Sequence, residues 1–212
     1  MIQQNFIVTG TVTSEPKPPK VNPVQFNKKK YNFFFRYDDV EGLHLPTGQS
    51  QSSAGMFVQY AIPETWNSLG PVTKGSRIIA MGQQNSNGNQ IGDVITSVYT
   101  QISSAYSAPE GVSLNDATGW GVVDSVKVKD SYCVYTIREK KQNSDKFRMY
   151  YVYRAKPAAI PEGSTVYWKG HILADMFPMP EDATPFQIGK APMFYATTIL
   201  PVKGPSNQAS YG

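Results

Sequence analysis

The stretch "GSRIIAMGQ" (residues 75–83) returns later in the 212-residue chain as "GSTVYWKGHI" (163–172). Both copies follow one pattern: Gly, Ser, any residue, Ile or Val, three residues and a second Gly. The β-branched and aromatic residues inside each copy fit a pleated, half-buried strand. A second copy of such a strand indicates that the chain builds the same small unit twice.

Other segments repeat around these two copies in the same order. "VTGTVTS" (8–14) is matched by "GWGVVDS" (119–125), a small-residue strand in which a glycine marks a bend or bulge. Each half also has an aromatic strand pair and closes with a β-branched strand, at 93–102 and 191–202. Five short strands with long loops in this order predict an all-β fold of two tandem five-stranded Greek-key barrels with little helix.

The segment between the two halves is small, polar and without periodicity, which is typical of a linker. The loops differ in length between the halves while the strands agree, because loops tolerate insertions that sheets do not. We therefore predict a first barrel at 1–105, a linker at 106–117, a second barrel at 118–204 and a flexible tail at 205–212.

The formal net charge is +4, which permits a polyanionic partner without requiring one. The distribution of charge is more informative than the total. Residues 17–36 contain six Lys and Arg and no acidic residue, and residues 127–156 contain nine Lys and Arg against three acidic residues. Each half of the chain therefore has its own basic stretch.

Several classes of protein are disfavoured. The single cysteine, Cys133, lies in an apolar stretch, so we expect a core residue and no intramolecular disulfide. No stretch approaches membrane-spanning length and no signal peptide is evident, so the expected location is the cytoplasm, or the host cytoplasm for a viral chain. His44 and His171 are the only histidines, and no HExxH, CxxC, GxSxG or phosphate-loop pattern occurs. We expect no enzyme, no metal and no cofactor.

The stretch "KKKYNFFFRYDD" (28–39) contains the first set of candidate binding residues. Alternate side chains of a strand point to opposite faces, so the stretch divides into two sets. One set is predicted to lie in the core: Tyr31, Phe33, Phe35 and Tyr37. The other set, with the preceding lysines, is predicted to meet a nucleic acid: Lys28, Lys29, Lys30, Asn32, Phe34 and Arg36.

The second half repeats this division in "YCVYTIR" (132–138) and "KFRMYYVYR" (146–154). The predicted core side comprises Cys133, Tyr135, Ile137, Phe147, Met149, Tyr151 and Tyr153. The predicted binding side comprises Tyr132, Arg138, Arg148, Tyr150 and Arg154. Trp66 and Trp168 are expected in the core, and Trp120 could lie on either side.

These residue types point to single strands of nucleic acid. Unpaired bases stack on aromatic rings for about 1–3 kcal/mol per base, and Lys and Arg neutralise the phosphates between them. Stacking tolerates any base, so such a surface would bind with little sequence preference and with strong dependence on salt. Arg77 belongs to the predicted basic set, and Tyr60 could be either a stacking ring or an interior residue.

Four segments of the first half resemble bacterial-type single-stranded DNA-binding proteins: "NFIVTGTVTSEP" (5–16), "AGMFVQYAIPETWNSL" (54–69), "TKGSRIIAMGQQ" (73–84) and "NGNQIGDVITSVYTQI" (87–102). The resemblance implies the oligonucleotide/oligosaccharide-binding (OB) fold, a stacking role for Tyr60, and a part in DNA replication or recombination. The second half resembles the same template more loosely. A tandem chain of this kind looks like a phage or mobile-element variant, in which two barrels replace part of a homo-oligomer.

The sequence departs from this family in two places. The late hairpin "QQNSNGNQ" (83–90) has no ring where the family has a stacking Trp, and "VKGPSNQASYG" (202–212) lacks the acidic tip that recruits replication and repair proteins. Protein partners are therefore not identifiable. Two alternatives stay open: a β-rich structural or assembly protein that binds no nucleic acid, and an RNA-binding OB-fold protein.

Overall fold

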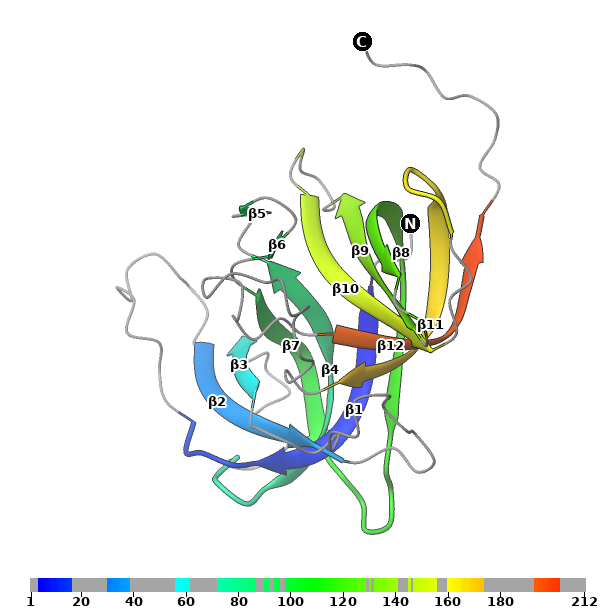
Figure 1. The fold of residues 1–212 in the computed structure, drawn as a ribbon. Helices are drawn as coiled ribbons and strands as arrows, with labels where there is room; N and C mark the ends of the chain where they lie inside the picture. The colour runs from blue at the N-terminus through cyan, green and yellow to red at the C-terminus, as the bar shows by residue number, and fades with distance from the viewer. Residues whose placement is uncertain are drawn as a thin grey trace.

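The computed structural model of the chain describes residues 4–16, 30–38, 56–61, 72–86, 90–91, 94–95, 98–128, 130, 132–140, 145, 147–155, 160–173 and 193–202. Every regular element within these ranges is a β-strand, which confirms the predicted all-β class (Figure 1). The described residues contain no helix with the length and apolar character needed to cross a membrane.

The first barrel is built from five strands: β1 (Asn5–Val12), β2 (Lys30–Tyr37), β3 (Met56–Ala61), β4 (Arg77–Ser86) and β7 (Val98–Ser107). They are hydrogen-bonded in the order β1-β2-β3-β7-β4, and β4 pairs back with β1 to close the barrel. Only β3 and β7 pair in parallel among these five strands. Two short strands, β5 (Gln90–Ile91) and β6 (Val94–Ile95), form a separate small sheet.

The second barrel has the same topology. Its strands are β8 (Asn115–Val128), β9 (Tyr132–Lys140), β10 (Phe147–Ala155), β11 (Thr165–Leu173) and β12 (Met193–Pro201). They follow the order β8-β9-β10-β12-β11, β11 pairs back with β8, and β10 and β12 pair in parallel. Closure pairs each of these ten described strands on both sides. The predicted fold, two tandem five-stranded barrels, is confirmed.

The repeated Gly-Ser motif opens the fourth strand of each barrel in the same way. Gly75 has φ 92° and Gly163 has φ 80°, a left-handed conformation that glycine adopts without steric cost. The Gly75 N–H donates to the carbonyl of Val12, and the Gly163 N–H donates to the carbonyl of Val123, both at 2.8 Å. The two turns therefore fix Val12 and Val123 as equivalent positions.

The second glycine of each motif lies at a β-bulge. The register between the fourth and fifth strands shifts at Met81/Gly82 in the first barrel and at Lys169/Gly170 in the second. A Cβ placed on Gly170 would lie 1.8 Å from the carbonyl oxygen of Tyr195, so a larger residue cannot fit beside that backbone. The sequence repeat thus marks two backbone features that both barrels need.

The two barrels share one continuous ten-stranded sheet because β1 pairs antiparallel with β8. Phe6 and Ala117 are opposite each other in this pairing, and they hold equivalent places in their barrels. The junction is therefore close to two-fold symmetric, with β1 and β8 side by side between the barrels (Figure 1).

The connection between the barrels covers residues 108–114, since β7 ends at Ser107 and β8 begins at Asn115. The expected linker, 106–117, is longer because both flanking strands extend further than their composition indicated. The other expected domain limits stay predictions, and the expected tail, 205–212, lies outside the described residues.

Each barrel fills its interior with the side chains of one strand face. Cys133 and Trp168 are fully buried, as predicted. A Cβ on Gly119 would lie 2.7 Å from the indole of Trp168, so the small residue makes room for the large one opposite it. At the equivalent positions of the first barrel Val8 lies opposite Ala80, so the two side chains that share this part of the core are closer to each other in size.

Candidate nucleic-acid interface

In the first barrel, the predicted division of β2 into two faces is confirmed for the side chains that are described. Phe33, Phe35 and Tyr37 are buried in the core. Arg36 is exposed and lies opposite Thr11 of β1, on the outer face. An exposed guanidinium on a β-strand is suited to contact a phosphate.

The other predicted binding residues of the first barrel are placed only by backbone. Phe34 lies opposite Phe57, and Tyr60 lies between Tyr31 of β2 and Ile102 of β7. The roles of Lys30, Asn32, Phe34 and Tyr60 stay predictions, because their side chains are not described. Four residues lie outside the described ranges: Lys28, Lys29, His44 and Trp66.

In the second barrel, the predicted division of β9 is confirmed. Cys133, Tyr135 and Ile137 are buried in the core, whereas Arg138 is exposed and Tyr132 is half-buried. Burial raises the pKa of Tyr135 to about 12.

For β10 the predicted division is wrong. Arg148 and Tyr150, expected on the binding side, are only 2% and 1% exposed, whereas Phe147, expected in the core, is 45% exposed. The register explains the error, because Arg148 lies opposite Glu139 and Tyr150 lies opposite Ile137. Residues directly opposite each other share a face, so the even-numbered side chains of β10 join the odd-numbered side chains of β9 inside.

Arg148 can be buried because its charge is matched within hydrogen-bond distance. Its Nε and Nη2 donate to the two carboxylate oxygens of Glu139 at 3.0 and 2.9 Å. Its Nη1 donates to Oε1 of Gln83 in β4 at 2.9 Å, and Glu139 also accepts from the backbone N–H of Gln4 at 3.2 Å. The buried pair therefore joins the two barrels rather than binding a phosphate.

Tyr150 is likewise a core residue, and its hydroxyl both donates and accepts a hydrogen bond. Its hydroxyl donates to the carbonyl of Trp120 and accepts from Nε1 of Trp168, both at 3.0 Å. Its ring packs against those of Trp168 and Phe194 at 5.8 and 5.6 Å. Burial raises the pKa of Tyr150 well above its ordinary value.

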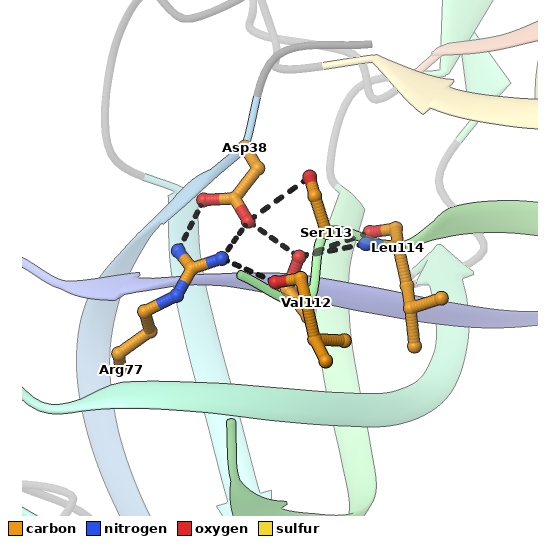
Figure 2. Close-up of polar contacts among 6 residues, drawn as sticks. Asp38, Arg77, Val112, Ser113 and Leu114 are labelled. Carbon is orange, nitrogen blue, oxygen red and sulfur yellow. Dashed lines mark hydrogen bonds and ion pairs between the residues drawn. The ribbon is translucent and has the colours of Figure 1, made fainter. Parts of the chain in front are cut away.

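Arg77 is held by a structural network at the end of the first barrel (Figure 2). Its Nη1 and Nη2 donate to the two carboxylate oxygens of Asp38 at 2.7 and 2.6 Å, and Nη2 also donates to the carbonyl of Val112. Asp38 further accepts from the hydroxyls of Thr9 and Ser113. The network fastens the linker to the first barrel, and a phosphate contact by Arg77 stays a prediction.

This arrangement favours the ionised form of Asp38. Burial alone would raise its pKa, but hydrogen bonds from Arg77 and Thr9 and the charge of Arg77 lower the pKa below the ordinary value. The carboxylate in turn raises the pKa of Arg77, mainly through their hydrogen bonds.

Two exposed arginines hold equivalent places in the two barrels. Arg36 lies opposite Thr11, the residue before Val12, and Arg138 lies opposite Val122, the residue before the equivalent Val123. Arg138 also lies 3.5 Å from a carboxylate oxygen of Asp124, and its guanidinium is 5.2 Å from the ring centroid of Phe147. Each barrel thus presents one arginine on the outer face of its second strand.

The outer face of the second barrel also carries a line of four rings, which we call the ring row: Tyr132, Tyr153, Tyr195 and His171. The ring centroids of Tyr132 and Tyr153 are 5.2 Å apart, those of Tyr153 and Tyr195 are 5.5 Å apart, and those of Tyr195 and His171 are 6.4 Å apart and stacked. The row crosses β9, β10, β12 and β11.

Within the ring row, Tyr153 is fully buried while the other three rings are half-buried. Tyr153 lies opposite Val134, one of the outward residues of β9, and is not part of the core cluster. The prediction that Tyr153 is covered is confirmed, but it is covered on the outer face. His171 is held by a 2.5 Å hydrogen bond between its Nδ1 and the carbonyl of Asn115. This bond holds His171 in place at one end of the ring row.

Arg154 was also predicted on the binding side, but it lies opposite the buried Cys133 and therefore on the inward face of β10, where it is half-buried. The sequence did not mark Tyr195 or Phe147 as candidates. Strand pairing would have placed both residues on the outer face, because Tyr195 lies beside Tyr153 and Phe147 lies opposite Lys140. Among the described residues, no group of three or more His, Cys, Asp or Glu side chains could hold a metal ion.

Two solved structures have a similar fold. Wild-type single-stranded DNA-binding protein from Thermus aquaticus matches 100% of this chain and 97% of its own at a TM-score of 0.62 and 13% identity. A deletion and substitution mutant of that protein matches 99% of this chain and 98% of its own at a TM-score of 0.64 and 12% identity. At these identities the likeness establishes the fold.

No protein-family model matches the chain, and no curated protein matches its sequence. The expected resemblance to single-stranded DNA-binding proteins is thus supported at the level of the fold, by structures whose similarity extends over both barrels.

Proposed function

We propose that this protein binds single-stranded DNA without sequence preference and coats strands exposed during replication or recombination. The observation that carries the proposal is the outer face of the second barrel, where the half-buried Tyr132 and Tyr195 flank Tyr153 on the same side of the sheet as the exposed Arg138. The fold shared with a single-stranded DNA-binding protein supports it.

The chemistry follows from what a single strand offers. Its bases expose flat π faces that stack on Tyr132, Tyr195 or Phe147, and its phosphates are neutralised by Arg138 in the second barrel and Arg36 in the first. Duplex DNA hides those base faces, so the same surface would discriminate against it. The role is binding, without catalysis.

A fluorescence-anisotropy titration with labelled oligo-dT at several salt concentrations tests the proposal. We expect tight binding at low salt and a linear fall of log K with log salt. Duplex DNA of equal length should bind far more weakly. Absence of oligo-dT binding at low salt would refute the proposal and favour a structural or assembly role. Tighter binding of a matched oligo-rU would assign the protein to RNA.

The proposal extends to the setting in which the protein acts. The setting that we propose is a phage or mobile element, although a bacterial protein shares the two-barrel fold, and the strand would then be coated in the cytoplasm of the host. Mass spectrometry of phage-infected cell fractions, after crosslinking to DNA, would detect the chain on replicating DNA or exclude it.

We also propose that the protein forms a homo-oligomer through the outer face of six neighbouring strands, in the order β7-β4-β1-β8-β11-β12. Ile79 lies opposite Tyr106 in the first barrel. At the equivalent positions of the second barrel, Tyr167 lies opposite Leu200. Three large apolar side chains are exposed on this face: Met81 (40%), Tyr106 (47%) and Leu200 (54%). A face with equivalent apolar pairs in its two halves suits a second copy of the same chain, related by a two-fold axis.

Light scattering coupled to size-exclusion chromatography measures this association. Replacement of Met81 and Leu200 by Lys should shift the mass to that of a single chain. Glu162→Lys, in the exposed turn before β11, is the control and should leave the mass unchanged. A single-chain mass for the unmodified protein at micromolar concentration would exclude the oligomer.

A further inference from the structure

The two barrels have the same strand order, but they differ at the positions of the ring row. The bulge glycines fix the correspondence, because Gly82 lies opposite Ile102 and Gly170 lies opposite Ala196. One residue further along, Gln83 lies opposite Gln101, whereas His171 lies opposite Tyr195. Two rings of the second barrel thus correspond to two amides of the first.

The correspondence continues across the next two strands. In the parallel pairs, Gln101 lies beside Gln59 in the first barrel, and Tyr195 lies beside Tyr153 in the second. On the second strands, Lys30 and Tyr132 are the equivalent residues, opposite Ala61 and Ala155 respectively. The row of four rings in the second barrel therefore corresponds to a row without any ring in the first: Lys30, Gln59, Gln101 and Gln83.

One member of the first barrel's row already has structural partners. Gln83 accepts a hydrogen bond from Arg148 and donates one to Oδ1 of Asn5 at 3.2 Å, so it contributes to the junction between the barrels. In the second barrel, the equivalent His171 is instead stacked on Tyr195. The same backbone position is thus used for assembly in one barrel and for the ring row in the other.

From these differences we infer that the barrels divide the work of binding a strand. The second barrel supplies base stacking through Tyr132, Tyr195 and His171, with the buried Tyr153 as the ring that positions them. At the equivalent backbone positions the first barrel has Lys and Gln residues, whose chemistry suits phosphates and base edges rather than base faces. This inference rests on the proposed function and adds which barrel holds the bases.

The division predicts different salt behaviour for the two barrels. Stacking releases no counterions, whereas each lost phosphate contact on a single strand lowers the slope of log K against log salt by about 0.7. Tyr195→Gln, which places the first barrel's residue in the ring row, should weaken oligo-dT binding about 5- to 150-fold and leave the slope unchanged. Arg36→Ala should reduce the slope.

Matched variants make the test specific. Gln101→Ala, at the equivalent position of the first barrel, removes an amide and not a stacking ring, so it should weaken oligo-dT binding less than Tyr195→Gln does. Tyr195→Phe keeps the ring and should bind as the unmodified protein does. If Tyr195→Gln lowers the melting temperature, Tyr132→Gln provides a second test of the same ring row. Tyr132 is half-buried at the start of β9, so its replacement should disturb the fold less.

A second readout locates the bases directly. Oligo-dT carrying 5-iodouracil, irradiated in complex with the unmodified protein, should crosslink to peptides that contain Tyr132 or Tyr195. Crosslinks confined to the first barrel, or an equal loss of affinity in Gln101→Ala and Tyr195→Gln, would overturn the division. Failure of the unmodified protein to bind oligo-dT would instead overturn the proposed function.

Discussion

At the scale of single residues, the main finding is that the charged side chain of Arg148 is buried. Arg148 has the residue type of a surface contact, yet Glu139 accepts hydrogen bonds from two of its nitrogens and Gln83 accepts one from the third. A buried pair with satisfied hydrogen bonds contributes little net stability, but loss of one partner leaves an uncompensated charge. Residue type alone therefore misplaced Arg148, because its partner is set by the pairing of two strands.

This pair leads to a prediction about stability. Arg148→Met should lower the free energy of unfolding by about 3–5 kcal/mol, because Glu139 would remain buried without a counter-charge. The double variant Arg148→Met, Glu139→Leu should be more stable than Arg148→Met alone. Urea unfolding followed by circular dichroism measures both. Equal or lower stability of the double variant would show that the pair does not act as a unit.

The Asp38 carboxylate leads to a prediction about pH. Its pKa is lower folded than unfolded, so its contribution to stability is present at neutral pH and is lost as the pH falls through the folded pKa. Asp38→Asn should therefore be less stable than the unmodified protein at pH 7, and the difference should shrink toward pH 2. Urea midpoints across this range measure it. A difference that stays constant with pH would contradict the role of Asp38.

At the scale of elements, strand patterns were predictable where one face carried rings and the other carried charge. In β2 and β9 the alternation matched the structure, with Arg36 and Arg138 outside. In β10 both faces carry rings, since Tyr150 and Val152 alternate with Tyr151 and Tyr153, and all four are buried. A period of two identifies the two faces of a strand but not which one is inside when both are covered.

The repeated glycines lead to a prediction at this scale. Gly163→Ala should cost about 1–2 kcal/mol, because φ is positive but no atom lies within 4 Å of the added Cβ. Gly170→Ala should cost clearly more, since its Cβ would collide with the backbone of Tyr195. Thermal melting of both variants gives the order. The reverse order would show that the β11–β12 bulge relaxes easily.

At the scale of the whole molecule, the barrels are joined by backbone and side chains together. Two contacts cross from one barrel to the other: the β1–β8 strand pairing and the buried hydrogen bond from Arg148 to Gln83. The Arg77–Asp38 network holds the linker between them against the first barrel. Such a junction couples the stability of the two barrels.

We therefore predict a single cooperative unfolding transition. With Trp66 replaced by Phe, the remaining tryptophans, Trp120 and Trp168, both report on the second barrel. Phe33→Ala, in the core of the first barrel, should then lower the urea midpoint seen by tryptophan fluorescence as much as that seen by circular dichroism. A fluorescence midpoint unchanged by Phe33→Ala would show that the barrels unfold independently.

The sequence by itself determined the β class, the internal repeat, the two five-stranded barrels and the outward arginines Arg36 and Arg138, because these depend on residue types and spacings within short segments. Tertiary structure alone decided that Arg148 and Tyr150 face inward, that β1 pairs with β8, and that four rings form a row on the second barrel. The physical reason is that these features depend on which residues are opposite each other across strands far apart in the chain. That register is set by closure of the barrels, which no local pattern records.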